Sequence, residues 1–206
     1  TTIEWFIIHH QGSTNDDENY FKTKNDRGSC PTWQVKADGS VVELIAPDKR
    51  PSSSGGANNK SVAVETQNTS MAPNWGISPE SHEAIAQLVA WMSQQTSING
   101  VPVNIKLDRN HVFGDNEITA KTGISIRATA CPGPSMNMDW IVARAKEIVA
   151  GPTKPEPQPE PKPDPTPEPE PQPDVITLTR EELLKQRSAA AQIVEFFDVI
   201  LAQKGD

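Results

Sequence analysis

Three side chains that could bind a metal ion stand far apart in this 206-residue chain. His9 belongs to a histidine pair that ends the apolar run at residues 5–8, and Cys131 follows His111 at a distance of 20 residues. Zinc favours imidazole nitrogen and thiolate sulfur, and catalytic zinc sites combine three protein ligands with a position for water. Structural sites draw ligands from close pairs such as Cys-x-x-Cys, which the sequence lacks. The spacing favours a catalytic zinc site; a hydrogen-bonded His111 and an inert buried Cys131 are the alternative.

Four segments in a fixed order resemble the zinc-dependent N-acetylmuramoyl-L-alanine amidase family. They are Ile-Ile-His-His at 7–10, Ser-Val-Ala-Val-Glu at 61–65, Asn-His at 110–111 and Thr-Ala-Cys-Pro-Gly at 129–133, the most specific of the four. The family includes many phage endolysins and the peptidoglycan recognition proteins. Together with a Pro-rich segment farther along, the arrangement looks most like an endolysin of a phage that infects actinobacterial hosts.

The resemblance implies a role for individual residues. His9, His111 and Cys131 match zinc ligands. Glu65 matches a general base, and Thr129 matches a position that helps to bind the oxyanion. The implied reaction is hydrolysis of the amide between N-acetylmuramic acid and L-alanine of the peptidoglycan stem peptide by a zinc-activated water.

Some of these assignments have alternatives. Neighbouring side chains on a strand point to opposite faces, so only one of His9 and His10 easily faces the metal; the family pattern favours His9. Certain viral members use a tyrosine near the hairpin, whereas Tyr20, the single tyrosine here, lies upstream and is expected to be structural. A disulfide between Cys30 and Cys131 would remove the sulfur ligand.

Substrate contacts are harder to assign from the sequence. Trp33, Trp75 and Phe113 are candidate groove walls because aromatic rings pack well on sugars, although core packing is an equal alternative. Asn68 either contacts the peptide or shapes a turn. A rival function is a peptidoglycan-binding module that does not cut; such family members commonly lose the cysteine, and Cys131 is present.

The elements that would position these residues are those of an α/β fold with a mixed central sheet flanked by helices. Residues 5–8 read as a strand buried on both faces, residues 33–36 and 40–44 as a hairpin around Asp38-Gly39, and residues 62–66 as a half-buried strand. A helix should begin at Ser78-Pro79. A second, at 139–150, should bury Trp140, Ile141, Ile148 and Val149 and end at Gly151.

The predicted catalytic domain, residues 1–151, precedes two further segments. Proline recurs nearly every second residue across 152–174, which predicts an extended, solvated linker. Residues 175–206 carry a capping box and an apolar stripe at helical spacing, so a C-terminal helix should pack on a second copy, the main domain or a partner. Self-association is the favoured outcome, and a protein whose main role is assembly through this helix is a third functional hypothesis.

Composition excludes some partners. The net charge of −8 and the absence of a Lys/Arg cluster argue against nucleic acid. No apolar run is long enough for a membrane span, and the first residues lack the features of a secretory signal, as a mature chain after signal removal also would. The expected location is the host cytoplasm until lysis and the bacterial cell wall afterwards.

Overall fold

The computed structural model describes residues 1–23 and 28–151; the predicted linker (152–174) and C-terminal helix (175–206) lie outside the described residues. Within the described part, five strands form a sheet in the order β3-β2-β4-β1-β7. The strands are β1 (Trp5–His10), β2 (Trp33–Val35), β3 (Val41–Glu43), β4 (Ser61–Thr66) and β7 (Val112–Gly114). Only β3, at one edge, runs antiparallel to its neighbour. The predicted mixed α/β sheet is confirmed.

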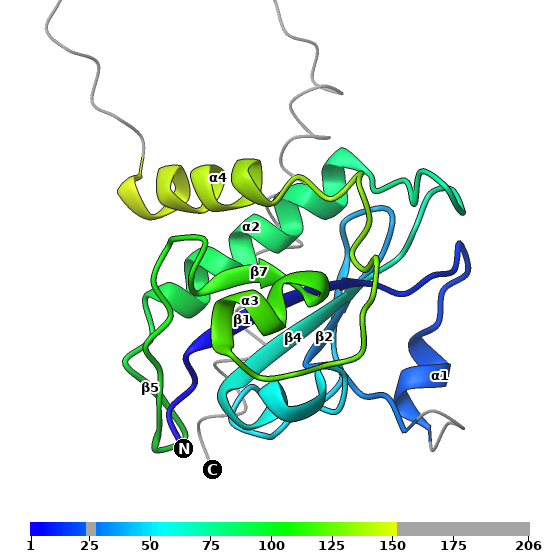
Figure 1. The fold of residues 1–206 in the computed structure, drawn as a ribbon. Coiled ribbons are helices and arrows are strands. Elements are labelled where there is room, and N and C mark those ends of the chain that lie inside the picture. Colours follow the sequence, from blue (N-terminus) through cyan, green and yellow to red (C-terminus); the bar gives the residue numbers. More distant parts are fainter. Residues whose placement is uncertain (24–27, 152–206) are drawn as a thin grey trace, which may run out of the picture. The chain divides into compact units, whose positions relative to one another are not determined.

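Alternation along β1 separates the two faces of this sheet. Phe6 and Ile8 join the main core with α2 (Pro79–Ser93) and α4 (Met138–Ala150), which lie side by side in Figure 1. Ile7 faces the opposite way and packs with Phe113 and with Ile118 of α3 (Ile118–Thr122). Since side chains alternate in a strand, His9 lies on the face of Ile7.

The remaining described elements are short. They are α1 (Glu18–Lys22), the 3-10 turns η1 (Gly55–Lys60) and η2 (Asp115–Glu117), and the small ribbon of β5 (Ser97–Ile98) and β6 (Val101–Pro102). Of these, η1 and η2 lie on or beside the face that carries His9, because Ala57 of η1 packs with Ile7 and η2 begins directly after β7. These short turns therefore supply the surroundings of the His9 side chain.

Burial corrects two expectations from the sequence. All six residues of β4 are buried, so it is not the half-buried strand predicted for 62–66, because β1 and β2 flank it and both faces are covered. In α4, Ile141 is fully buried, but Trp140 and Val149 are 41% and 39% exposed. Trp140 is one step around the helix from Ile141, and its ring lies against His82 of α2 at the surface.

Local signals in the sequence are confirmed. The hairpin turns at Gly39, whose φ of +85° suits a residue without Cβ. Pro79 opens α2 after the Ser78 cap, and α4 ends at Gly151 with φ +71°. Each signal depends on a few consecutive residues, so long-range packing does not override it.

The Ser78 cap also ties α2 to the hairpin. Its hydroxyl accepts from the Ser81 amide at 3.0 Å and donates to the Ala37 carbonyl at 2.6 Å. We expect Ser78→Ala to lower the free energy of unfolding by about 1–2 kcal/mol, because both partners lose a bond in a buried setting. Urea denaturation measures this. Ser93→Ala, which removes a hydroxyl bonded only within the end of α2, should cost less, and an equal loss would contradict the double role of Ser78.

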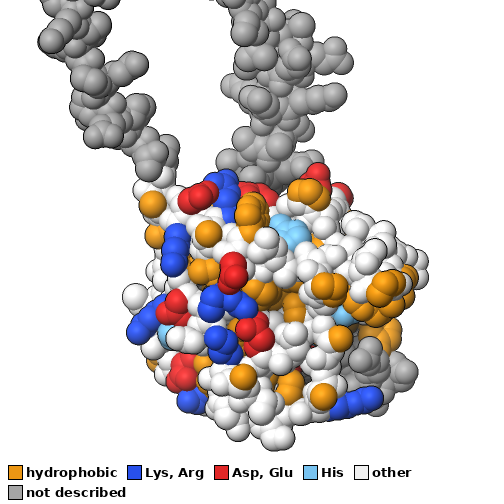
Figure 2. Space-filling model, turned by 45° about the horizontal axis from the view of Figure 1, so that its top comes forward, with side chains coloured by type: hydrophobic (Ala, Val, Ile, Leu, Met, Phe, Trp, Pro, Cys, Tyr) orange, Lys and Arg blue, Asp and Glu red, His pale blue; other side chains and the backbone are white. Residues whose placement is uncertain are grey.

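Charged side chains of both signs mix on the face in Figure 2. Arg144 of α4 pairs with Glu83 of α2 at 2.9 Å, and Arg109 pairs with Glu117 of η2 at 2.7 Å. The first pair links α4 to α2. The second pair links Arg109, which precedes β7, to η2, which follows β7. Among the described residues no helix combines the length and apolar character that crossing a membrane requires.

Candidate metal centre and active site

A row of polar side chains crosses the sheet at the carboxyl ends of its parallel strands. His9 of β1 is in register with Glu65 of β4, which is in register with Gln34 of β2. On the other side of β1, Ile8 is in register with Gly114, so Asp115 comes next to His9. Residues in register on neighbouring strands point to the same face, and the carboxyl edge of a parallel sheet is where ligands bind in α/β proteins.

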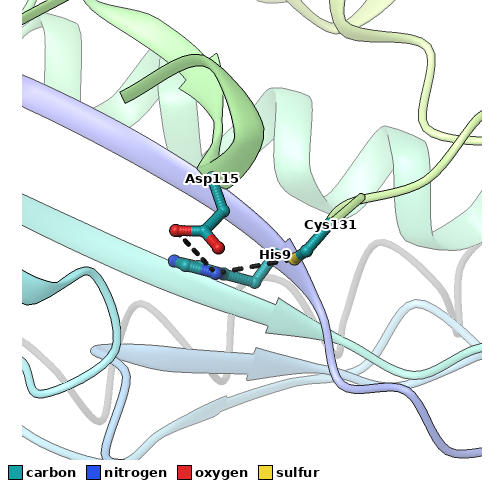
Figure 3. A group of neighbouring side chains, drawn as sticks. All are labelled: His9, Asp115 and Cys131. Carbon is teal, nitrogen blue, oxygen red and sulfur yellow. Dashed lines mark hydrogen bonds and ion pairs between the residues drawn. The ribbon is translucent and has the colours of Figure 1, made fainter. Parts of the chain in front are cut away.

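Three potential metal ligands meet at this edge (Figure 3). The Nδ1 atom of His9 lies 3.6 Å from Sγ of Cys131 and 3.8 Å from Oδ1 of Asp115. The ligand atoms of these three residues all lie within 4.8 Å of one another. Cys30 and Cys131 do not form a disulfide with each other, so the loss of the Cys131 sulfur to such a bond does not occur.

Close packing brings the Cys131 loop to the sheet. A Cβ on Gly114 would come within 2.5 Å of the Pro132 ring, so glycine is required for this approach. The Asn116 amide donates to the Cys131 carbonyl at 2.8 Å, and the His10 amide donates to Cys131 Sγ at 3.3 Å. The backbone of β1 and the start of η2 therefore fix the position of the sulfur.

Burial sets the charge state of two members of the group. His9 is 3% exposed, and burial, with a smaller contribution from nearby His10, lowers its pKa to about 3. The imidazole is therefore neutral at neutral pH, and its 3.8 Å contact with Asp115 is not an ion pair. Burial raises the pKa of Asp115 to about 6, so its carboxylate is ionised at neutral pH. A neutral imidazole, a carboxylate and a sulfur facing one another form a donor set that suits Zn²⁺.

The raised pKa of Asp115 predicts that its carboxylate destabilises the metal-free fold. A carboxyl group with a raised folded pKa contributes stability below its ordinary pKa of 3.8 and loses it as the pH rises through about 6. A shift of about two units corresponds to about 3 kcal/mol, which residual solvation reduces to about 1 kcal/mol. We therefore expect Asp115→Asn to stabilise the metal-free protein by about 1 kcal/mol above pH 6.

Urea denaturation in a chelator, repeated across the pH range, measures this effect. The gain should disappear below about pH 3, where the carboxyl is protonated in both the folded and the unfolded protein. A variant less stable than the parent at neutral pH would show that the carboxylate supports the fold rather than straining it.

The structure does not bring His111 to this group. It precedes β7, its carbonyl accepts from the Phe6 amide, and its Nδ1 lies 2.7 Å from Oδ1 of Asp108. The register of β7 against β1 places His111 beside Trp5, four residues before His9. Four residues along a strand correspond to a separation of roughly 13 Å between His111 and His9. Of the predicted set of His9, His111 and Cys131, the structure thus brings together His9 and Cys131, and it places Asp115 beside them where His111 was expected.

The alternative first ligand, His10, points away from the group. Its ring packs on Trp75 with centroids 4.5 Å apart, and its Nδ1 lies 3.1 Å from Oδ1 of Asn68. The choice of His9 over His10 therefore agrees with the geometry. Asn68 is 1% exposed and also accepts from the Gly12 amide, which agrees with a role in shaping the turn.

A pocket of about 400 Å³ opens over the group. The predicted base Glu65 and the predicted oxyanion residue Thr129 line it, together with His9, His10, Gln11, Gly12, Asp17, Tyr20, Phe21, Ser29, Ser53, Asp115 and Cys131. Tyr20, for which the sequence predicts a structural role, comes from α1 and lies in the wall of this pocket. No pattern around this short helix in the sequence indicates that it borders the site.

The three aromatic residues predicted to line a substrate groove differ in their burial. Trp33 and Phe113 are 1% and 0% exposed, and both lie in the core: Trp33 stacks on Phe6, and Phe113 packs with Ile7. They cannot contact a substrate in this structure, because strand alternation turns them inward. Trp75 is half-buried between His10 and Gly133 and stays a candidate wall.

A family model described as N-acetylmuramoyl-L-alanine amidase matches residues 1–134. None of the curated proteins is detectably similar to the chain in sequence. The matched segment includes His9, Asp115 and Cys131, so the family comparison and the geometry point to the same part of the chain.

Several solved structures have a similar fold. The amidase LysC from Clostridium intestinale URNW has a TM-score of 0.52 at 14% identity, covering 69% of this chain and 85% of its own. The endolysin amidase LysCS from the same organism gives 0.51 at 13% identity, with 69% and 83% covered. A selenomethionine derivative of AmpD gives 0.50 at 16% identity, with 72% and 86% covered. At these identities the likeness concerns the fold.

Proposed function

The chain belongs to the N-acetylmuramoyl-L-alanine amidase family, and from this premise we propose that it hydrolyses the amide between N-acetylmuramic acid and L-alanine of peptidoglycan. The observation that carries the proposal is the convergence of His9, Asp115 and Cys131 beside Glu65 in one pocket. Peptidoglycan is the substrate in this proposal.

The proposed cofactor is Zn²⁺, held by His9, Asp115 and Cys131. Nitrogen, oxygen and sulfur are all donors that zinc accepts, and three protein ligands are the usual number in a catalytic site. When bound, zinc supplies Lewis-acid chemistry, which activates water and polarises a carbonyl.

Glu65 is the proposed proton carrier. It is 9% exposed and borders the pocket in register with His9, so it lies beside the ligand group and not within it. In the reaction the water oxygen forms a bond to the lactyl carbonyl carbon, and Glu65 takes a water proton. The carbon–nitrogen bond then breaks, and Glu65 gives the proton to the amine of L-alanine.

Thr129 is the proposed oxyanion donor. Its Oγ1 accepts from the Cys131 amide at 3.1 Å, which orients the hydroxyl and leaves its hydrogen to be donated. Thr129 also lines the pocket, so it could donate to the oxygen that gains charge as the carbonyl is attacked.

The proposed biological role is phage-driven lysis of an actinobacterial host. The support is the resemblance of the four segments to endolysins, together with the proline-rich composition of residues 152–174. In this role the protein would act on the cell wall after release from the host cytoplasm.

Incubation with purified cell walls tests the activity. We expect new L-alanine amino termini to appear, to be lost with a chelator and to return when Zn²⁺ is added. Saturable wall binding without any release would instead support the non-catalytic peptidoglycan-binding module. Release that persists after complete zinc removal would contradict the proposed cofactor.

A further inference from the structure

A buried hydroxyl contacts the far side of the His9 ring. Oγ of Ser54 lies 2.9 Å from Nε2 of His9, and the two residues are 2% and 3% exposed. The other ring nitrogen, Nδ1, faces Cys131 and Asp115. Ser54 thus hydrogen-bonds to Nε2, the ring nitrogen of His9 that does not face Cys131 and Asp115.

The turn before η1 holds Ser54 in place. The carboxamide oxygen of Asn58 accepts from the Ser54 amide at 2.7 Å and from the Ser53 amide at 3.2 Å. Asn58 is 7% exposed, and the Ala57 amide donates to the Ser54 carbonyl at 3.1 Å. The backbone of Ser54 is therefore fixed by a network that includes no member of the ligand group.

We propose that Ser54 is a positioning residue that sets the tautomer of His9. Its oxygen accepts the Nε2 hydrogen, so that Nδ1 carries the lone pair directed at the metal position, and its own hydrogen is directed to Ser53 Oγ at 3.4 Å. A neutral imidazole has one donor and one acceptor nitrogen, and the bond made by one decides the role of the other. The opposite tautomer would direct a hydrogen at the ion. This inference rests on the proposed metal centre.

The first test measures zinc affinity by competition with a chromophoric chelator. Residues that hydrogen-bond to a metal ligand without contacting the metal typically contribute about 10–100-fold to metal affinity. We therefore expect Ser54→Ala to weaken zinc binding by about that factor. Ser54→Thr keeps the hydroxyl and should restore most of the affinity. Ser52→Ala is the matched control, because Ser52 is exposed and two residues away, and it should bind zinc as the parent does.

The second test identifies the tautomer by NMR of the imidazole nitrogens, and it needs neither zinc nor activity. In the metal-free parent the His9 hydrogen should be on Nε2, and in Ser54→Ala this preference should weaken. A hydrogen on Nδ1 in the parent, or unchanged zinc affinity in a folded Ser54→Ala protein, would overturn the proposal. A parent that binds no zinc would refute the metal centre, and the metal-free tautomer would still decide the role of Ser54.

Discussion

Zinc binding should be lost when Asp115 is replaced by asparagine and should be kept when His111 is replaced by alanine. This expected contrast follows from the geometry, since Asp115 is one of three residues whose ligand atoms lie within 4.8 Å, whereas His111 bonds to Asp108. Asparagine keeps the shape of the side chain and removes the charge that attracts the ion. We expect amidase activity to fall by about a thousandfold, equivalent to about 4 kcal/mol of lost Lewis-acid stabilisation.

Metal content and cell-wall hydrolysis, measured on the same preparations, test this contrast. His9→Ala and Cys131→Ala should behave like Asp115→Asn, because each removes one member of the same group. Zinc lost from His111→Ala and retained by Asp115→Asn would restore the ligand set that the sequence predicts. Urea denaturation of the same preparations separates a loss of zinc from a loss of the fold, because Asp115→Asn is expected to be at least as stable as the parent without metal.

The position of Asp115 beside His9 and Cys131 could not be predicted from the sequence. His9 and Cys131 could be predicted because each stands in a segment of distinctive composition, a strand that ends in histidines and a Thr-Ala-Cys-Pro-Gly run. Which residue lies beside His9 depends on the register of β7 against β1. This register places His111 next to Trp5 and Asp115 next to His9. Residues 112–114 form a strand too short to predict from periodicity, so no register could be inferred. An acidic residue directly after an apolar run was the available signal.

The same limit applies to burial. The hairpin at Asp38-Gly39 and the cap at Ser78 could be predicted because each depends on a few neighbouring residues. The full burial of β4 depends on strands from both sides of it in the sequence, and the inward orientation of Trp33 depends on its contact with Phe6. Long-range contacts of this kind leave no local pattern.

Function and stability make opposite demands on the row of polar side chains at the sheet edge. Asp115 carries a pKa raised by burial, and His9 carries one lowered by burial, so the fold holds both groups where their charged forms are disfavoured. An apolar residue would cost less at either position. The arrangement becomes favourable when a cation binds, because a carboxylate, a sulfur and a neutral nitrogen then have a common partner.

Glu65→Gln should separate catalysis from metal binding. Glu65 lies next to His9 in register and outside the ligand group, so the variant is expected to bind zinc as tightly as the parent. Glutamine is close in size and accepts no proton at neutral pH, so kcat should fall by about 10²–10⁴-fold, the usual contribution of general acid–base catalysis. KM should change little, because the side chain moves a proton and does not anchor the substrate.

Steady-state release of L-alanine amino termini, combined with zinc titration, measures both quantities for Glu65→Gln. Glu43→Gln is the matched control, because it removes a carboxylate from the edge strand β3 and should leave both quantities unchanged. Full activity in Glu65→Gln would assign the proton transfer to another pocket group, of which Tyr20 and Asp17 are the titratable candidates outside the histidines and the ligand group. Loss of zinc together with rate would instead make Glu65 part of the metal centre, and the separation of roles argued from the strand register would fail.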